Sequence, residues 1–228
     1  MIVNNFVFIH IPKTGGQSIE AYLKSGVSGT HKDFQLGPNS LERVGPPRLA
    51  HMTLSEYQKH HADKLSGKVF FCILRSVQDR FISEMNFRGF GPAAADRHLR
   101  NTQLGYIVDD YRTYEDELRH MMPQKKFLEN AAGLCQKVFC IRYDTFFSDP
   151  KGFLEKLNIY RSANFPYIRP SAVPIIKRLR PGREGLSRLP EITKHRLNDF
   201  YGQDSLLYEA LPESGWGTFC VENHGYFS

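Results

Sequence analysis

A short run near the N-terminus holds residue types that bind phosphate groups. It lies between an apolar, β-rich segment at 6–11 and a segment that can form a helix over 18–24. Where a strand turns into a helix, exposed backbone N–H groups can hold an anion together. Gly15 and Gly16 let the backbone approach a ligand closely, Lys13 supplies a positive charge, and Thr14 and Ser18 carry hydroxyl donors. The pattern predicts a phosphate cradle over His10-Ile11-Pro12-Lys13-Thr14-Gly15-Gly16-Gln17-Ser18.

Two other interpretations fit parts of this run. A simple glycine turn beside a solvated lysine accounts for Gly15 and Gly16 by themselves. A P-loop kinase or NTPase needs GxxxxGK[ST], with the lysine after the glycines, and an acidic residue at a strand end for Mg²⁺. Here Lys13 precedes the glycines, and the second predicted strand ends in Arg75. A P-loop kinase or NTPase is therefore the second hypothesis, and a phosphate-binding protein of another kind is the first.

A second candidate phosphate contact follows the next predicted strand, over 68–74. Arg75 comes directly after this strand, and Ser83 lies eight residues later at the start of a predicted helix. An arginine can hold a phosphate through two parallel hydrogen bonds, and a serine hydroxyl can add a third. A salt bridge toward the helix is the alternative role for Arg75. Two phosphate contacts after successive strands favour the ligand-binding role.

The order of elements predicts an α/β fold. Strands at 6–11, 68–74 and 137–141 alternate with helical segments, which indicates a three-layer parallel sheet flanked by helices, in one domain over 1–228. A capping box at Thr53 and Glu56 predicts a helix to about residue 60, and two further helices are expected over 190–201 and 204–211. In such sheets, ligands bind beyond the carboxyl ends of the strands.

These motifs carry a resemblance to a known family. HIPKTGGQS resembles the 5'-phosphosulfate loop of sulfotransferases that use PAPS (3'-phosphoadenosine 5'-phosphosulfate), particularly the branch of Golgi carbohydrate enzymes such as the heparan sulfate 2-O sulfotransferases. The segment 74–83 is similar to the family's 3'-phosphate segment, although Ser76 and Val77 replace the usual Asp-Pro, and Gln17 replaces a usual Thr or Ser. Weaker similarities at 122–128, 141–150 and 189–211 follow in the family's order.

The resemblance implies a P-loop-like sulfotransferase fold and transfer of a sulfuryl group from PAPS to a hydroxyl or amine, releasing PAP. Lys13 would stabilise the leaving phosphate. No metal is required in principle, because that phosphate is already a weak base. The residues implied for donor binding are Lys13, Thr14, Gly15, Gly16, Gln17, Ser18, Arg75 and Ser83.

A hydroxyl acceptor also needs a general base, and histidine is the usual side chain. The resemblance places the family's base segment at 49–53, so His51 is the expected catalytic base. A residue that only neighbours the helix start is the alternative role for His51, with Glu20 and Asp79 as substitute bases. His10 is expected to be a structural neighbour of the loop. The histidines at 60, 61, 98 and 120 are expected at the surface.

The charge composition of the chain limits the kinds of ligand that we expect it to bind. The 228 residues carry 30 Lys and Arg against 24 Asp and Glu, a net charge of +6. This favours anionic ligands, but the charges are mixed along the chain, so nucleic acid is not expected. A carbohydrate or small-molecule acceptor, anionic or neutral, is the predicted partner, and a non-catalytic polyanion-binding module is a third hypothesis. No signal peptide, long apolar run or paired cysteine motif is seen, so we expect a cytoplasmic protein without a membrane span.

Overall fold

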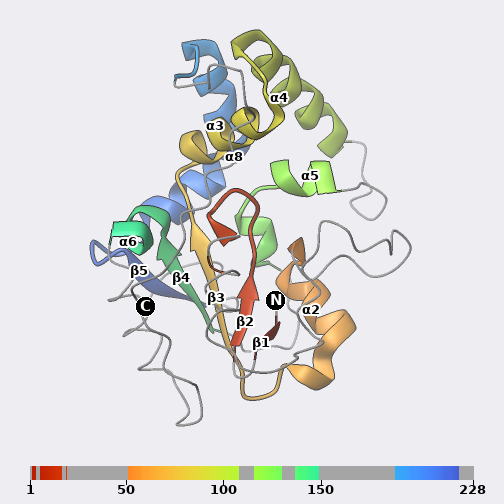
Figure 1. The fold of residues 1–228 in the computed structure, drawn as a ribbon, viewed down its shortest axis with the longest axis vertical. Helices are drawn as coiled ribbons and strands as arrows, with labels where there is room; N and C mark the ends of the chain where they lie inside the picture. The colour runs from red at the N-terminus through yellow and green to blue at the C-terminus, as the bar shows by residue number, and fades with distance from the viewer. Residues whose placement is uncertain are drawn as a thin grey trace.

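The computed structural model describes residues 2–3, 6–16, 19, 51–107, 116–129, 137–148 and 188–220 (Figure 1). Its strands are β1 (Ile2–Val3), β2 (Phe6–Ile9), β3 (Val69–Leu74), β4 (Lys137–Arg142) and β5 (Trp216–Cys220). Its α-helices are α2 (Leu54–His61), α3 (Val77–Arg88), α4 (Pro92–Ile107), α5 (Asp116–Met121), α6 (Tyr143–Ser148) and α8 (Glu191–Glu209), and its 3-10 turns are η2 (Ala62–Lys64) and η3 (Lys125–Phe127).

The described strands form one mixed sheet in the order β1-β2-β3-β4-β5. The three central strands are parallel, as predicted, so their carboxyl ends meet at the same edge. Both outer strands are antiparallel to their neighbours, which differs from the expected all-parallel sheet. The α/β class is confirmed, and the common edge of β2, β3 and β4 brings the segments after residues 9, 74 and 142 together.

Both faces of the central strands are buried, which explains their nearly continuous apolar sequences. On one face, Cys72 packs in a cluster with Tyr57 of α2 and Leu207 of α8. On the other, the rings of Phe8 and Phe71 stack with centroids 4.9 Å apart, and both are fully buried. The strands therefore form a rigid centre from which the loops at the carboxyl edge extend.

A second apolar cluster joins α3, α4, α5 and α8 beyond the carboxyl ends of the central strands (Figure 1). Met85, Leu99 and Leu197 are fully buried there. This helical group fixes α3 and α5 beside the loop that follows β2. It includes α4, a helix that was not predicted from the sequence.

Several local predictions are confirmed by hydrogen bonding at helix ends. Thr53 and Glu56 make the predicted capping box at the start of α2. Ser76 caps α3 by accepting from the Asp79 N–H, so this helix begins at Val77, six residues before Ser83. The two predicted C-terminal helices are one helix, α8, with a non-helical backbone at Tyr201 between them. The expected helix at 18–24 lies outside the described residues, apart from Ile19.

Within the described ranges, no helix is both long enough and apolar enough to cross a bilayer.

Candidate functional site

The loop after β2 has a tight, internally bonded backbone. Lys13 has a φ of 68° and Gly15 a φ of 86°, so two residues of the turn are left-handed. The Thr14 hydroxyl is fully buried and donates to the Ile11 carbonyl at 2.8 Å. Thr14 can therefore face an anion only through its backbone N–H, not through its hydroxyl as predicted. The Ile19 N–H donates to the Gly15 carbonyl, which is the bond of a first helical turn.

Both glycines of the loop are required by close packing. A Cβ on Gly16 would lie 2.0 Å from two atoms of the His10 ring. A Cβ on Gly15 would lie 2.7 Å from the Phe147 ring of α6 and 3.1 Å from the ring of Tyr143. The loop backbone is therefore pressed between an imidazole on one side and aromatic rings on the other. Such a backbone is preorganised to present its N–H groups without reordering on binding.

The structure brings the two predicted phosphate contacts together. Arg75 follows β3, and its NH1 group donates to the Lys13 carbonyl at 3.1 Å. Its guanidinium lies over the Tyr143 ring, 4.2 Å from the centroid. The Arg75 Nε atom is buried and makes no hydrogen bond to the described residues. A buried, unsatisfied cationic donor beside a glycine loop is a place where an anionic oxygen would fit.

The backbone of Arg75 is held by a side chain that no sequence signal had linked to it. Gln124 is fully buried, and its amide accepts from the Arg75 N–H at 3.0 Å and donates to the Arg75 carbonyl at 2.8 Å. The Gln124 and Lys125 N–H groups in turn donate to the buried carboxylate of Asp204 on α8. Burial raises the pKa of Asp204 despite the charge of Arg80 and these N–H donors. The site after β3 is thus fixed from α8 through Gln124.

Arg80 ties the loop to α5. This arginine is almost fully buried on α3, and its Nε donates to the Pro12 carbonyl at 3.0 Å. Its NH2 donates to the His120 carbonyl at 2.9 Å. One guanidinium therefore sets the spacing between the glycine loop and the end of α5.

Three histidines from distant segments gather next to the loop. The ring of His51 lies between the other two, with centroids 4.9 Å from His10 and 5.1 Å from His120, both in edge-to-face geometry. The His120 side chain is only 14% exposed, so its predicted surface position was wrong. Phe87 packs 5.8 Å from His120, and the Lys13 ammonium lies over the Phe87 ring at 4.2 Å. The predicted catalytic lysine and base are therefore parts of one cluster.

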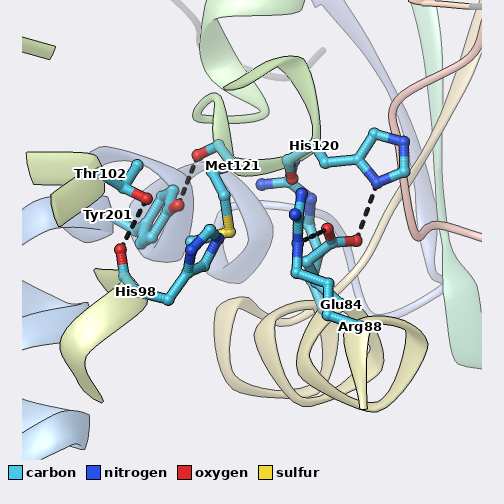
Figure 2. Close-up of polar contacts among 8 residues, drawn as sticks. Glu84, Arg88, His98, Thr102, His120, Met121 and Tyr201 are labelled. Carbon is cyan, nitrogen blue, oxygen red and sulfur yellow. Dashed lines mark hydrogen bonds and ion pairs between the residues drawn. The ribbon is translucent and has the colours of Figure 1, made fainter. Parts of the chain in front are cut away.

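Glu84 anchors this cluster from α3 (Figure 2). It is 1% exposed, and its two carboxylate oxygens face the Nδ1 of His120 at 2.8 Å and the Nε of Arg88 at 2.6 Å. Burial alone would raise the pKa of Glu84. The hydrogen bond and charge of His120, with the charges of Arg88 and Lys13, outweigh burial and hold that pKa at about 2. Glu84 is therefore ionised, and it had not been singled out because it reads as one more polar residue of an amphipathic helix.

The backbone of His51 is also fixed. Arg119 of α5 donates to the His51 carbonyl at 2.8 Å and pairs with both carboxylate oxygens of Glu56. Burial opposes ionisation of Glu56, but the hydrogen bond and charge of Arg119 lower its pKa below the usual value. The capping box of α2 thus extends into an ion pair that locks His51 beside α5.

Of the remaining predicted residues, the structure describes Ser83 and Asp79 and leaves the others undescribed. Ser83 lies half-buried on α3, one residue before Glu84, while Gln17, Ser18 and Glu20 lie outside the described residues or side chains. Asp79, named as a substitute base, is exposed and engaged with the Ser76 hydroxyl at the start of α3. No cluster of His, Cys, Asp and Glu with the arrangement of a metal site occurs among the described residues.

Comparisons with known proteins add no name to this site: no family model, no curated protein and no solved structure matches the chain.

Proposed function

We propose that this chain is a PAPS-dependent sulfotransferase, transferring the sulfuryl group of PAPS to a hydroxyl or amine of a carbohydrate or small-molecule acceptor. One observation carries the proposal: the guanidinium of Arg75 reaches the carbonyl of Lys13. The two segments that resemble the family's 5'-phosphosulfate and 3'-phosphate sites are thus adjacent, as a nucleotide bearing both groups requires. The buried Nε of Arg75 and the close-packed glycines suit an anionic ligand.

The site residues have distinct roles in this reaction. The loop N–H groups and Lys13 would bind the 5'-phosphosulfate and stabilise charge on the leaving phosphate, while Arg75 and Ser83 would bind the 3'-phosphate. The acceptor oxygen forms a bond to sulfur as the bond from sulfur to the phosphate oxygen breaks, and the acceptor proton passes to a base. The sequence assigns that base to His51, which lies in the histidine cluster beside the loop.

The rival hypotheses fit the site less well. A P-loop kinase or NTPase would need a carboxylate at the end of β3, where Arg75 stands. A polyanion-binding module would need exposed cationic side chains, whereas Arg75 and Arg80 are partly or almost fully buried and bonded to the loop backbone. Both observations favour a small anionic ligand held within the fold.

Calorimetric titration with PAP, with ATP and Mg²⁺ as the competing ligand, tests the proposal. We expect micromolar PAP binding that needs no metal. Lys13→Ala and Arg75→Ala should each weaken it by roughly 10- to 100-fold, as expected for a lost charged hydrogen bond. The matched controls Lys126→Ala and Arg97→Ala remove exposed cations away from the loop and should leave PAP affinity unchanged.

Three results would contradict the proposal. Preference for ATP with Mg²⁺ would support the kinase or NTPase. Binding only to heparin-like polymers, with steep salt dependence and similar losses in all four variants, would support the polyanion module. PAP binding that is indifferent to Lys13 and Arg75 would place the nucleotide elsewhere.

A further inference from the structure

We infer that His120, oriented by Glu84, is the general base of this site, in place of the His51 that the sequence assigns. The inference rests on the proposed sulfuryl transfer and names the residue that accepts the acceptor's proton. Glu84 is then a positioning residue that acts through His120. Neither residue belonged to the predicted site.

The first step is the tautomer of His120. Glu84 is buried and ionised, so both of its oxygens can only accept hydrogen bonds. The His120 Nδ1 that faces it at 2.8 Å must therefore carry a proton. In the neutral ring the lone pair is then on Nε2, which is the nitrogen that can take a proton from an acceptor.

The second step is the orientation of the His120 ring by a carboxylate. A base is efficient when a third group orients it and stabilises its charged form, which a carboxylate does for an imidazole. Glu84 gives His120 that partner (Figure 2). His120 therefore has the orienting carboxylate that an efficient base needs.

The third step is placement. Arg80 holds the His120 backbone against the loop at Pro12. The Lys13 ammonium and the His120 ring both pack against Phe87, so the cation assigned to the leaving group and the imidazole share one aromatic neighbour. A proton acceptor and a leaving-group cation must both lie close to the transferred sulfuryl group.

The proton balance of the step is simple. The acceptor oxygen bonds to sulfur, the bond between sulfur and the 5'-phosphate oxygen breaks with its electron pair leaving on PAP, and the hydroxyl proton moves to Nε2 of His120. The charge of the resulting imidazolium is stabilised by Glu84. The groups that can influence its titration are Glu84, Arg88 and Arg80 on α3, Lys13 and His10 beside the loop, His51 before α2, Arg119 on α5 and Tyr201 on α8.

The experiment follows PAP formation from PAPS, with water as the acceptor, across pH 5 to 9. The wild-type rate should fall at low pH as the base becomes protonated. His120→Asn should lose about 100-fold or more in rate, and its acid limb should disappear. Glu84→Gln should slow the reaction and move the acid limb to lower pH by about one unit, because the imidazolium loses its carboxylate partner. His51→Asn should keep the acid limb.

Two further variants separate catalysis from folding. Asp96→Asn removes a partly buried carboxylate that pairs with Arg196, between α4 and α8, and should leave the pH profile unchanged. The double variant Glu84→Gln/His120→Asn removes the buried carboxylate together with its imidazole partner, and Arg88 loses an ion pair. It should bind PAP as tightly as the wild type while lacking the acid limb.

Each outcome has a distinct meaning. Turnover in which His51→Asn, and not His120→Asn, loses the acid limb overturns this inference and leaves the proposed function standing. An unchanged limb in Glu84→Gln overturns the orienting role of Glu84. A wild-type protein that neither binds PAP nor forms it from PAPS overturns the proposed function, and this inference with it.

Discussion

The two strand ends that form the candidate site are built in opposite ways. After β2, the turn is made by its own residues, with left-handed backbone at Lys13 and Gly15 and a bond from Thr14 back to Ile11, and distant arginines add bonds to its carbonyls. After β3, Arg75 is held by side chains from far along the chain. Local backbone geometry leaves a pattern in the sequence, whereas support from distant side chains leaves none.

The largest expected effect comes from removing the side chain that holds the Arg75 backbone from a distance. Gln124→Leu keeps the volume roughly constant but leaves the buried N–H and carbonyl of Arg75 without their amide partner. We expect unfolding free energy to fall by about 4 kcal/mol, since each unsatisfied buried group costs about 1–3 kcal/mol. Urea denaturation measures the change, and PAP affinity should fall with it because Arg75 loses its fixed position.

The matched control is Gln203→Leu. Gln203 is exposed on α8 and accepts a solvent-exposed bond from Lys125, so its loss should change stability by less than about 0.5 kcal/mol. If both variants unfold at the same urea concentration, Gln124 does not hold Arg75, and the strand ends do not differ in the way proposed.

The same contrast explains what the sequence could predict. The central strands, the capping box at Thr53 and the turn after β2 depend on neighbouring residues, and their predicted positions are close to the observed ones. The partners of Arg75 and the carboxylate of His120 come from 49 and 36 residues away. The resemblance marked the segment 122–128 but gave no partner for Gln124, and the pattern around Glu84 does not distinguish it from an ordinary polar residue, so only the fold reveals their roles.

The mistaken predictions have equally physical causes. His120 was expected at the surface because a lone histidine on a short helix is usually solvated, yet α5 packs against α3 and buries it. The α4 helix was not predicted, and its hydrophobic pattern is weak. Among the side chains of this helix that the structure describes, Ala95 and Leu99 enter the apolar cluster with α3 and α8.

A second prediction tests the loop side of the comparison. Gly16→Ala would place a Cβ 2.0 Å from the His10 ring, which is itself stacked on Phe8 and cannot move freely. We expect a loss of about 3 kcal/mol from this overpacking, measured by thermal or urea unfolding. In contrast, Gly202→Ala meets no atom within 4 Å in α8 and should be neutral or slightly stabilising.

A double variant identifies the cause of the loss. If the clash with the imidazole is responsible, adding Gly16→Ala to a His10→Ala background should cost little further stability. Equal losses in the two backgrounds would show that Gly16 is needed for its backbone conformation, and not for its contact with His10.

The smallest expected effect is at Lys13, where two variants separate the role of the ammonium charge from that of the backbone conformation. Its φ of 68° is strained for a residue with a side chain, by about 1 kcal/mol, and glycine would adopt it freely. Lys13→Gly should therefore be about 1 kcal/mol more stable than Lys13→Ala, while both lose PAP affinity to the same extent. Equal stability of the two variants would remove the strain argument, and PAP affinity retained by Lys13→Gly would show that the backbone, without the ammonium, binds the phosphate. The expected result, a more stable protein with a weaker site, would mean that the lysine is present for its charge and that the loop tolerates its strain.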